Sequence, residues 1–214
     1  MTQLYNSDLS PFAGRVRVGC LYKGVPLELA DPPGGLHSEA YRAITPIDKL
    51  PVMTHGDLVM PESQVILEYL DETHEGPSLL PGTAAERARA RLLARLGDLY
   101  VFPPLTTLFG QLNPKYRDAA VVDAKLAELK KALGYVEHHL AGGPFAAGPA
   151  FSVADCALPT VCFFVDNFAP VFGLTEPYAE APKLRAYLAG IAAHPAVAPI
   201  LAAQTEALRK MQKR

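Results

Sequence analysis

The spacing of apolar residues changes along the chain, and the first 80 residues alternate between two periods. Short runs with a period of two predict strands, and longer runs with a period of about 3.6 predict helices. The predicted strands cover residues 2–5, 25–29, 51–54 and 58–60, and the predicted helices cover residues 12–23 and 62–73. This β-α-β order followed by β-β-α is typical of a small α/β layer.

Beyond residue 83 the strand pattern disappears. Helices are predicted at residues 84–112, 118–140, 152–168, 182–193 and 195–213, with a break in the first at Pro103-Pro104. Two prolines and two glycines in HEGPSLLPGT mark a linker between the mixed strand-and-helix part of the chain and the helical part. The sequence therefore predicts an α/β domain at residues 1–75, a linker at 76–83 and an all-helical domain at 84–214.

Composition supports a folded chain and excludes several classes of partner. With 50% hydrophobic and 20% charged residues, the chain can bury a core. The 20 Lys and Arg residues nearly balance the 22 Asp and Glu residues, which argues against nucleic acid or an anionic membrane as a partner. The three cysteines have the spacing of neither a disulfide framework nor a zinc site, so no metal is expected.

The N-terminal sequence gives no sign of export. MTQLYNSD lacks the basic and apolar segments of a secretion signal, and no uninterrupted apolar run approaches the roughly 18 residues of a membrane span. We therefore expect a cytoplasmic protein that has no membrane partner.

Ser10-Pro11 is the first candidate for chemistry, because it opens the helix that follows the first strand. Serine is a good helix N-cap, and proline is well tolerated in the first turn. Gly24 is expected to end the same helix as a left-handed cap, and Ser152 with Asp155 is expected to form a capping box at a later helix. The hydroxyl of Ser10 can instead donate to a bound thiol at the positive end of its helix and so favour the thiolate. From Ser-Pro alone, a purely capping role is the simpler interpretation.

Two further segments offer groups for a peptide-like ligand. Pro51 begins a strand, and a cis bond there would leave the backbone of Leu50 free, although only about 5–6% of X-Pro bonds are cis. Glu62 and Ser63 open the next helix, where they can face an amino group and a carboxylate or can simply cap the helix. Lys49 can hold a second carboxylate or can be a solvated lysine.

Other reactive side chains have simpler interpretations. Cys20 lies inside a helix and is expected to be buried, and the six histidines have no metal-like spacing. Several aromatic residues of the helical half can line an apolar pocket, although the core is the more common place for such rings. They are Tyr100, Phe102, Phe109, Phe163, Phe164 and Phe168.

Four motifs in register resemble those of the glutathione S-transferases. SPFAGRVR at 10–17 is similar to the active-site turn of the serine and cysteine classes, and DKLPVM at 48–53 is similar to the strand with the cis-proline. PESQVILEYL at 61–70 resembles the glutathione-binding helix, and FSVAD at 151–155 resembles the capping motif of the helical domain. We identify a serine-type member of the bacterial type, with a turn like those of the tau, omega and zeta classes.

The resemblance implies a fold and a set of roles. Residues 1–75 would form a thioredoxin-like domain packed on the helical domain, and Ser10 would activate the sulfur of glutathione. Tyr5 lies where other classes have a catalytic tyrosine, yet the turn favours Ser10.

Glutathione would also be held by residues from the other matched motifs. Leu50 would pair its backbone with the cysteinyl unit beside cis-Pro51, Glu62 and Ser63 would hold the γ-glutamyl end, and Lys49 would meet the glycine carboxylate. The chain departs from the family in having no tryptophan, and the segment 31–47 matches nothing specific for the glycine end.

The resemblance further implies a homodimeric detoxification enzyme that adds the glutathione thiolate to a small hydrophobic electrophile, with glutathione as co-substrate and no metal. A serine cannot form mixed disulfides, which favours this reaction over thiol transfer. Glutathione-dependent isomerisation, ether cleavage or thiol transfer is one alternative. A non-catalytic interaction protein of the same fold is the other.

Overall fold

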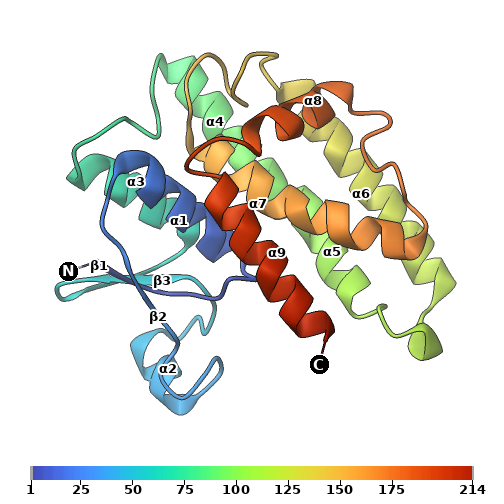
Figure 1. The fold of residues 1–214 in the computed structure, drawn as a ribbon, viewed down its shortest axis with the longest axis horizontal. Helices are drawn as coiled ribbons and strands as arrows, with labels where there is room; N and C mark the ends of the chain where they lie inside the picture. Colours follow the sequence, from blue (N-terminus) through green and yellow to red (C-terminus); the bar gives the residue numbers. More distant parts are fainter. Residues whose placement is uncertain (1, 214) are drawn as a thin grey trace. The chain divides into compact units, whose positions relative to one another are not determined.

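The computed structural model describes residues 2–213, and its contacts divide the chain into two compact units (Figure 1). The first unit comprises the residues up to Leu80 together with those from His194 onward, and the second comprises Pro81–Ala193. This grouping differs from a division in chain order, because the last helix packs with the first unit. The domain boundaries at 1–75 and 84–214 stay a prediction.

A four-stranded mixed sheet organises the first unit. Its strands are β1 (Thr2–Tyr5), β2 (Glu28–Ala30), β3 (Val52–His55) and β4 (Leu58–Pro61), in the spatial order β2-β1-β3-β4. β1 pairs with β2 in parallel and with β3 antiparallel, and β3 and β4 form a hairpin. The four predicted strands are therefore present, with β2 shorter and later than the pattern indicated.

Four helices accompany this sheet: α1 (Pro11–Lys23), α2 (Glu39–Ile44), α3 (Ser63–Thr73) and α9 (Ala198–Gln212). α1 packs against α3 and α9, and Figure 1 shows α1 and α3 on one side of the sheet and α2 on the other. Leu4, Val16, Met53 and Ile66 meet in the core between sheet and helices. This mixed sheet with its helices is the thioredoxin-like fold that the resemblance implied.

Local capping fixes both ends of α1, as the sequence predicted. The Ser10 side chain accepts a hydrogen bond from the backbone N–H of Ala13, and Pro11 occupies the first turn. Gly24 ends the helix with φ 72°, a left-handed conformation that glycine adopts without a steric penalty.

The second unit is all-helical. It contains α4 (Ala84–Leu96), α5 (Phe102–Phe109), α6 (Ala119–His139), α7 (Val153–Phe168) and α8 (Pro182–Ile191). A π-helical turn, Gly97–Val101, separates α4 from α5, so the expected break lies just before Pro103-Pro104. The prolines lie in the first turn of α5, where their missing N–H groups are not needed.

α7 is the central helix of the second unit, and its start depends on a buried carboxylate. Asp155 accepts hydrogen bonds from the N–H and hydroxyl of Ser152, both at 2.9 Å, and from the hydroxyl of Tyr187 at 3.0 Å. The capping box predicted for Ser152 and Asp155 is thus confirmed.

One helical segment passes a length and composition test for a membrane span. Val153–Phe172 is long and apolar enough to cross a membrane by length and composition, because α7 continues into a short 3-10 helix. However, 72% of this window is buried in the structure, as is usual for the core helix of a folded unit.

Candidate functional site

A cavity of about 150 Å³ in the first unit brings together the five residues predicted to bind glutathione; the predicted catalytic residue, Ser10, is not part of its lining. Its lining consists of Phe12, Ile47, Lys49, Leu50, Pro51, Pro61, Glu62 and Ser63. These residues come from the start of α1, the segment before β3, the end of β4 and the start of α3. Segments that are far apart in the sequence therefore form one wall.

Ser10 caps the N-terminus of α1 and lies two residues before Phe12, the first residue of the cavity lining. Its hydroxyl oxygen accepts from the N–H of Ala13 at 3.1 Å. A hydroxyl has two acceptor lone pairs and one hydrogen, so capping leaves the hydrogen free to donate to a ligand. The capping and thiol-activating interpretations are therefore compatible.

The segment before β3 presents unpaired backbone to the cavity. The Leu50–Pro51 bond is cis, as the resemblance implied and contrary to what the tripeptide alone favoured. β3 begins at Val52, and no backbone hydrogen bond of Leu50 is present within residues 2–213.

A buried tyrosine supports this segment, and the sequence reasoning missed it. Tyr41 of α2 donates from its hydroxyl to the carbonyl of Lys49 at 2.8 Å. α2 itself was not predicted, because it has only six residues and follows a proline- and glycine-rich stretch. The signal that could have found it is Ser38, which caps the helix three residues before Tyr41.

Lys49 supplies a positive charge at the cavity. Its side chain is exposed, and no carboxylate pairs with its ammonium in the described part of the chain. It is therefore available to a carboxylate of a bound ligand.

The start of α3 has an unusual backbone. Glu62 occupies the N-cap position with φ 71°, a conformation that costs a non-glycine residue about 1–3 kcal/mol. Its carboxylate makes no capping hydrogen bond, so the simple capping interpretation does not describe this residue. Ser63 follows it, is buried and also lines the cavity.

Phe12 adds an apolar wall and connects the cavity to a buried cation. The guanidinium carbon of Arg15 lies 5.1 Å from the centre of the Phe12 ring. Arg15 is wholly buried, so this positive charge is weakly screened.

Most of the aromatic residues noted in the helical half form a cluster in the second unit. Phe102 of α5 contacts Phe164 of α7, and Phe109 of α5 contacts both Phe164 and Phe168, with ring centres 4.8–6.0 Å apart. Phe102 and Phe109 themselves lie 6.3 Å apart. The α7 rings are buried and belong to the core, whereas those of α5 are half-buried. Tyr100 is exposed and packs instead against Tyr135.

Of the competing candidates for catalysis, Cys20 lacks a suitable environment. Cys20 is buried, and desolvation raises the pKa of its thiol to about 12, so it is a poor nucleophile. Tyr5 packs edge-on against Tyr41. Within residues 2–213, no group of three or more His, Cys, Asp or Glu side chains could hold a metal ion.

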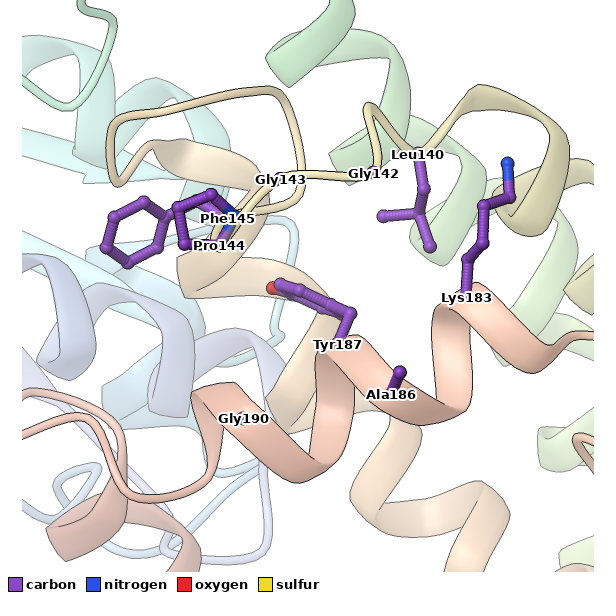
Figure 2. A pocket seen from close by; sticks show the side chains of 9 residues that line it. All are labelled: Leu140, Gly142, Gly143, Pro144, Phe145, Lys183, Ala186, Tyr187 and Gly190. Atoms are coloured by element: carbon purple, nitrogen blue, oxygen red, sulfur yellow. The ribbon is translucent and has the colours of Figure 1, made fainter.

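A larger hollow, of about 280 Å³, lies in the second unit beside α8 and the glycine-rich loop after α6 (Figure 2). Leu140, Phe145 and Ala186 make its wall mostly apolar, and the hydroxyl of Tyr187 is engaged with Asp155. It contains none of the predicted site residues.

Comparisons with known proteins agree with this geometry. Residues 4–78 match the N-terminal domain of glutathione S-transferases, and residues 119–190 match their C-terminal domain. The chain is 32% identical to glutathione S-transferase L3 of Arabidopsis thaliana over 199 residues, which is 87% of this chain and 76% of that protein. It is 30% identical to glutathione S-transferase 3 of Zea mays over 211 residues, 94% of this chain and 93% of that one. A solved glutathione S-transferase from Rhodospirillum rubrum is 27% identical, with a TM-score of 0.76 over 94% of this chain and 91% of its own.

Proposed function

Since the chain belongs to the glutathione S-transferase family and is a transferase, we propose that it ionises the thiol of glutathione and adds the thiolate to a hydrophobic electrophile. The new bond joins the sulfur to an electrophilic carbon, and the thiol proton leaves to solvent. Where the carbon carries a halide, the halide departs with the bonding electron pair.

The observation that carries this proposal is the set of unsatisfied groups at the 150 Å³ cavity. Glutathione is a tripeptide with one amino group, two carboxylates and two amide bonds. The carboxylate of Glu62 suits the amino group, Ser63 at the helix N-terminus suits the adjacent carboxylate, and Lys49 suits the glycine carboxylate. Leu50, beside Pro51, offers backbone groups to the cysteinyl amide.

Ser10 is the proposed catalytic residue. A hydroxyl donor at the positive end of α1 stabilises a thiolate relative to a thiol. Lowering the pKa of a thiol by about 1–2 units corresponds to roughly 1.4–2.7 kcal/mol and makes the thiolate abundant at neutral pH.

The electrophile is proposed to be apolar and to contact Phe12, a half-buried ring that lines the cavity two residues after Ser10. Half-buried rings provide a rigid apolar surface that suits aromatic and alkyl groups.

Two alternatives remain in competition with conjugation. Isomerisation, ether cleavage or thiol transfer would use the same glutathione site, but thiol transfer is disfavoured by a serine that cannot form a disulfide. A non-catalytic interaction protein would have no need for an unpaired Lys49 and a strained Glu62 at one cavity.

We further propose a cytoplasmic homodimer with a detoxifying role. Apolar residues on the first unit, Leu58, Val59 and Val65, are 42–54% exposed. A self-complementary contact that covers them would remove this apolar area from water.

The decisive experiment is calorimetric titration with glutathione, combined with a turnover assay on a chlorinated aromatic compound. Binding together with turnover supports the proposal. Binding without turnover points to one of the other glutathione-dependent reactions. No binding at millimolar glutathione would contradict the proposal and favour the interaction protein.

A further inference from the structure

Two histidine rings lie beside each other at the end of α3 that is remote from Ser63. His55 is the last residue of β3, and His74 follows the last residue of α3. Their ring centres are 5.8 Å apart, and the ring planes are tilted by 38°. Both residues are half-buried, which restricts the motion of the rings.

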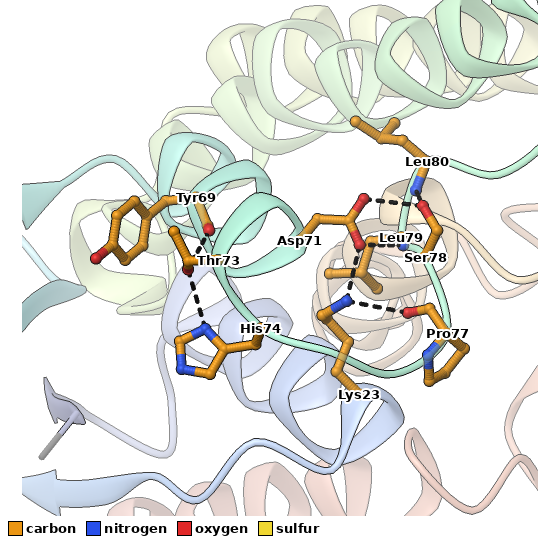
Figure 3. A network of polar contacts seen from close by, with 9 residues as sticks. All are labelled: Lys23, Tyr69, Asp71, Thr73, His74, Pro77, Ser78, Leu79 and Leu80. Atoms are coloured by element: carbon orange, nitrogen blue, oxygen red, sulfur yellow. Dashed lines mark hydrogen bonds and ion pairs between the residues drawn. The ribbon is translucent and has the colours of Figure 1, made fainter.

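A hydroxyl group holds the Nδ1 atom of each ring. The hydroxyl of Tyr69 lies 3.0 Å from Nδ1 of His55, and the hydroxyl of Thr73 lies 3.0 Å from Nδ1 of His74 (Figure 3 shows the latter). Neither Nε2 atom has a hydrogen-bond partner within residues 2–213. Metal-ligating histidines have such an arrangement, in which a polar partner orients one ring nitrogen and the other is left for the metal. Ligation through Nε2 requires the proton on Nδ1, so both hydroxyls must accept from Nδ1–H. Thr73 can do so because its own hydrogen is donated to the carbonyl of Tyr69 at 2.6 Å.

The ring separation fits a shared ion. A metal about 2.0–2.1 Å from one nitrogen of each ring lies roughly 3.2 Å from each ring centre, so a tetrahedral ion holds the two centres about 5.2 Å apart. With both Nε2 atoms turned toward one ion, the observed 5.8 Å requires an approach of only roughly 0.6 Å, or a wider angle at the metal.

We propose that His55 and His74 form a binding site for a divalent transition-metal ion of borderline softness, with Zn²⁺ as the representative. Two neutral imidazole nitrogens would bind the ion, and water would complete its coordination. Glu72 and Glu75 flank His74 in the sequence and are exposed, so they add negative charge that favours a cation.

This site is distinct from the glutathione cavity and does not depend on the proposed function. Ser63 and Thr73 are the first and last residues of the 11-residue helix α3, so they lie roughly 15 Å apart at 1.5 Å per residue. A bound ion would connect the end of β3 to the end of α3, and would thereby stabilise the first unit.

The test is calorimetric titration of the untagged protein with Zn²⁺ at about pH 7.5, where imidazole is mostly neutral. Glutathione is left out because its thiol binds the metal. We expect one ion per chain, with affinity at least tenfold weaker in His55→Ala and in His74→Ala. Tyr69→Phe, which removes the hydroxyl that orients His55, should weaken binding by about tenfold or more.

His138→Ala is the matched control, since it removes one imidazole of a neighbouring pair, His138 and His139, whose rings are 4.8 Å apart. Its affinity for Zn²⁺ should equal that of the unmodified protein. Circular dichroism establishes whether each variant folds. His74 lies after the last residue of α3, so His74→Ala changes no residue of the sheet, whereas His55→Ala changes a residue of β3. The proposal is overturned if no binding occurs up to millimolar Zn²⁺, or if His55→Ala and His74→Ala bind as tightly as His138→Ala.

Discussion

Ser10 combines a structural and a proposed chemical role in one hydroxyl group. Its oxygen accepts from the N–H of Ala13, and its hydrogen remains available to a thiolate. A cap is worth about 1 kcal/mol of stability, whereas one positioned donor is worth about 2.7–4 kcal/mol in a transition state. Removing the hydroxyl should therefore harm catalysis more than folding.

Ser10→Ala should lower kcat/KM for conjugation by about 10- to 1000-fold, with glutathione affinity nearly unchanged, because one donor to the sulfur is lost. Steady-state kinetics and calorimetry measure the two effects. Thr83→Ala is the control, since Thr83 caps α4 through a similar hydrogen bond, 3.3 Å from the N–H of Glu86. An unchanged rate in Ser10→Ala would remove Ser10 from the mechanism.

Glu62 shows a conflict between stability and binding. Its positive φ is costly for any residue with a side chain, yet the carboxylate is the group proposed to hold the amino group of glutathione.

Glu62→Gly should therefore increase the free energy of unfolding by about 1 kcal/mol, because glycine adopts this conformation without strain. Affinity for glutathione should fall at least tenfold in the same variant. Urea unfolding and calorimetry measure the two quantities. Glu72→Gly, at an exposed position of α3 with ordinary helical backbone, is the control and should lose about 1 kcal/mol. If Glu62→Gly is destabilised as much as Glu72→Gly, strain is not stored at Glu62.

At the scale of elements, a partly buried ion pair fixes the start of the predicted linker to the first unit (Figure 3). The ammonium of Lys23 lies 3.0 Å from the carboxylate of Asp71 and 3.2 Å from the carbonyl of Pro77. Asp71 also accepts from the N–H of Leu79 at 2.7 Å and from the hydroxyl of Ser78 at 2.9 Å. The linker is thus ordered by α1 and α3.

This network makes the stability of the first unit depend on pH. Burial alone would raise the pKa of Asp71, but hydrogen bonds from Leu79, Lys23 and Ser78 outweigh it and lower the pKa below the ordinary value. A lowered pKa means that the stabilisation is present above the unfolded-state value of about 3.9 and is lost as the pH falls through the folded-state value.

Asp71→Asn should consequently flatten the decline of stability between about pH 5 and pH 2, because the amide does not titrate. Urea unfolding at a series of pH values measures the slope. Asp57→Asn, in the exposed turn between β3 and β4, controls for the loss of one carboxylate. If the free energy of unfolding of Asp71→Asn falls with pH as steeply as that of Asp57→Asn, the network does not depend on the negative charge of Asp71.

The elements themselves were largely predictable, because periodicity and caps are local properties. The four strands and the helices α1 and α3 follow from apolar spacing, and Ser10 and Gly24 mark both ends of α1. The exceptions have physical causes. α2 is too short to show a period, and the π-helical turn at Gly97–Val101 has no strong sequence signal.

At the scale of the whole molecule, exposed apolar side chains point to association. Val65 of α3 is 54% exposed although α3 otherwise buries its apolar residues Ile66, Leu67 and Leu70. Val171 has a similar exposure, 48%, in a different element of the chain, so the two valines provide a matched pair.

We expect the unmodified protein to sediment at twice its chain mass of 23.0 kDa, and Val65→Glu to sediment as a monomer. A charge buried at a self-complementary contact occurs twice in a symmetric dimer, which doubles its cost. Val171→Glu should remain dimeric. Analytical ultracentrifugation distinguishes these species, and a monomeric unmodified protein, or equal effects at both valines, would contradict the proposed homodimer.

The sequence by itself determined the features that depend on neighbours in the chain. These are the α/β-then-helical order, the caps at Ser10, Ser152 and Gly24, and the near balance of acidic and basic residues. The roles of Lys49, Leu50, Pro51, Glu62 and Ser63 came from the resemblance and stay predictions.

Only the tertiary structure decided features that depend on packing between distant segments. It brought the start of α1, the segment before β3 and the start of α3 to one cavity, and it packed α9 against α1. It also gave Leu50–Pro51 its cis bond and Glu62 its positive φ, and it placed His55 beside His74. Each of these arrangements is disfavoured or unspecified locally, and is selected because burial and hydrogen bonding over the whole unit outweigh local preference.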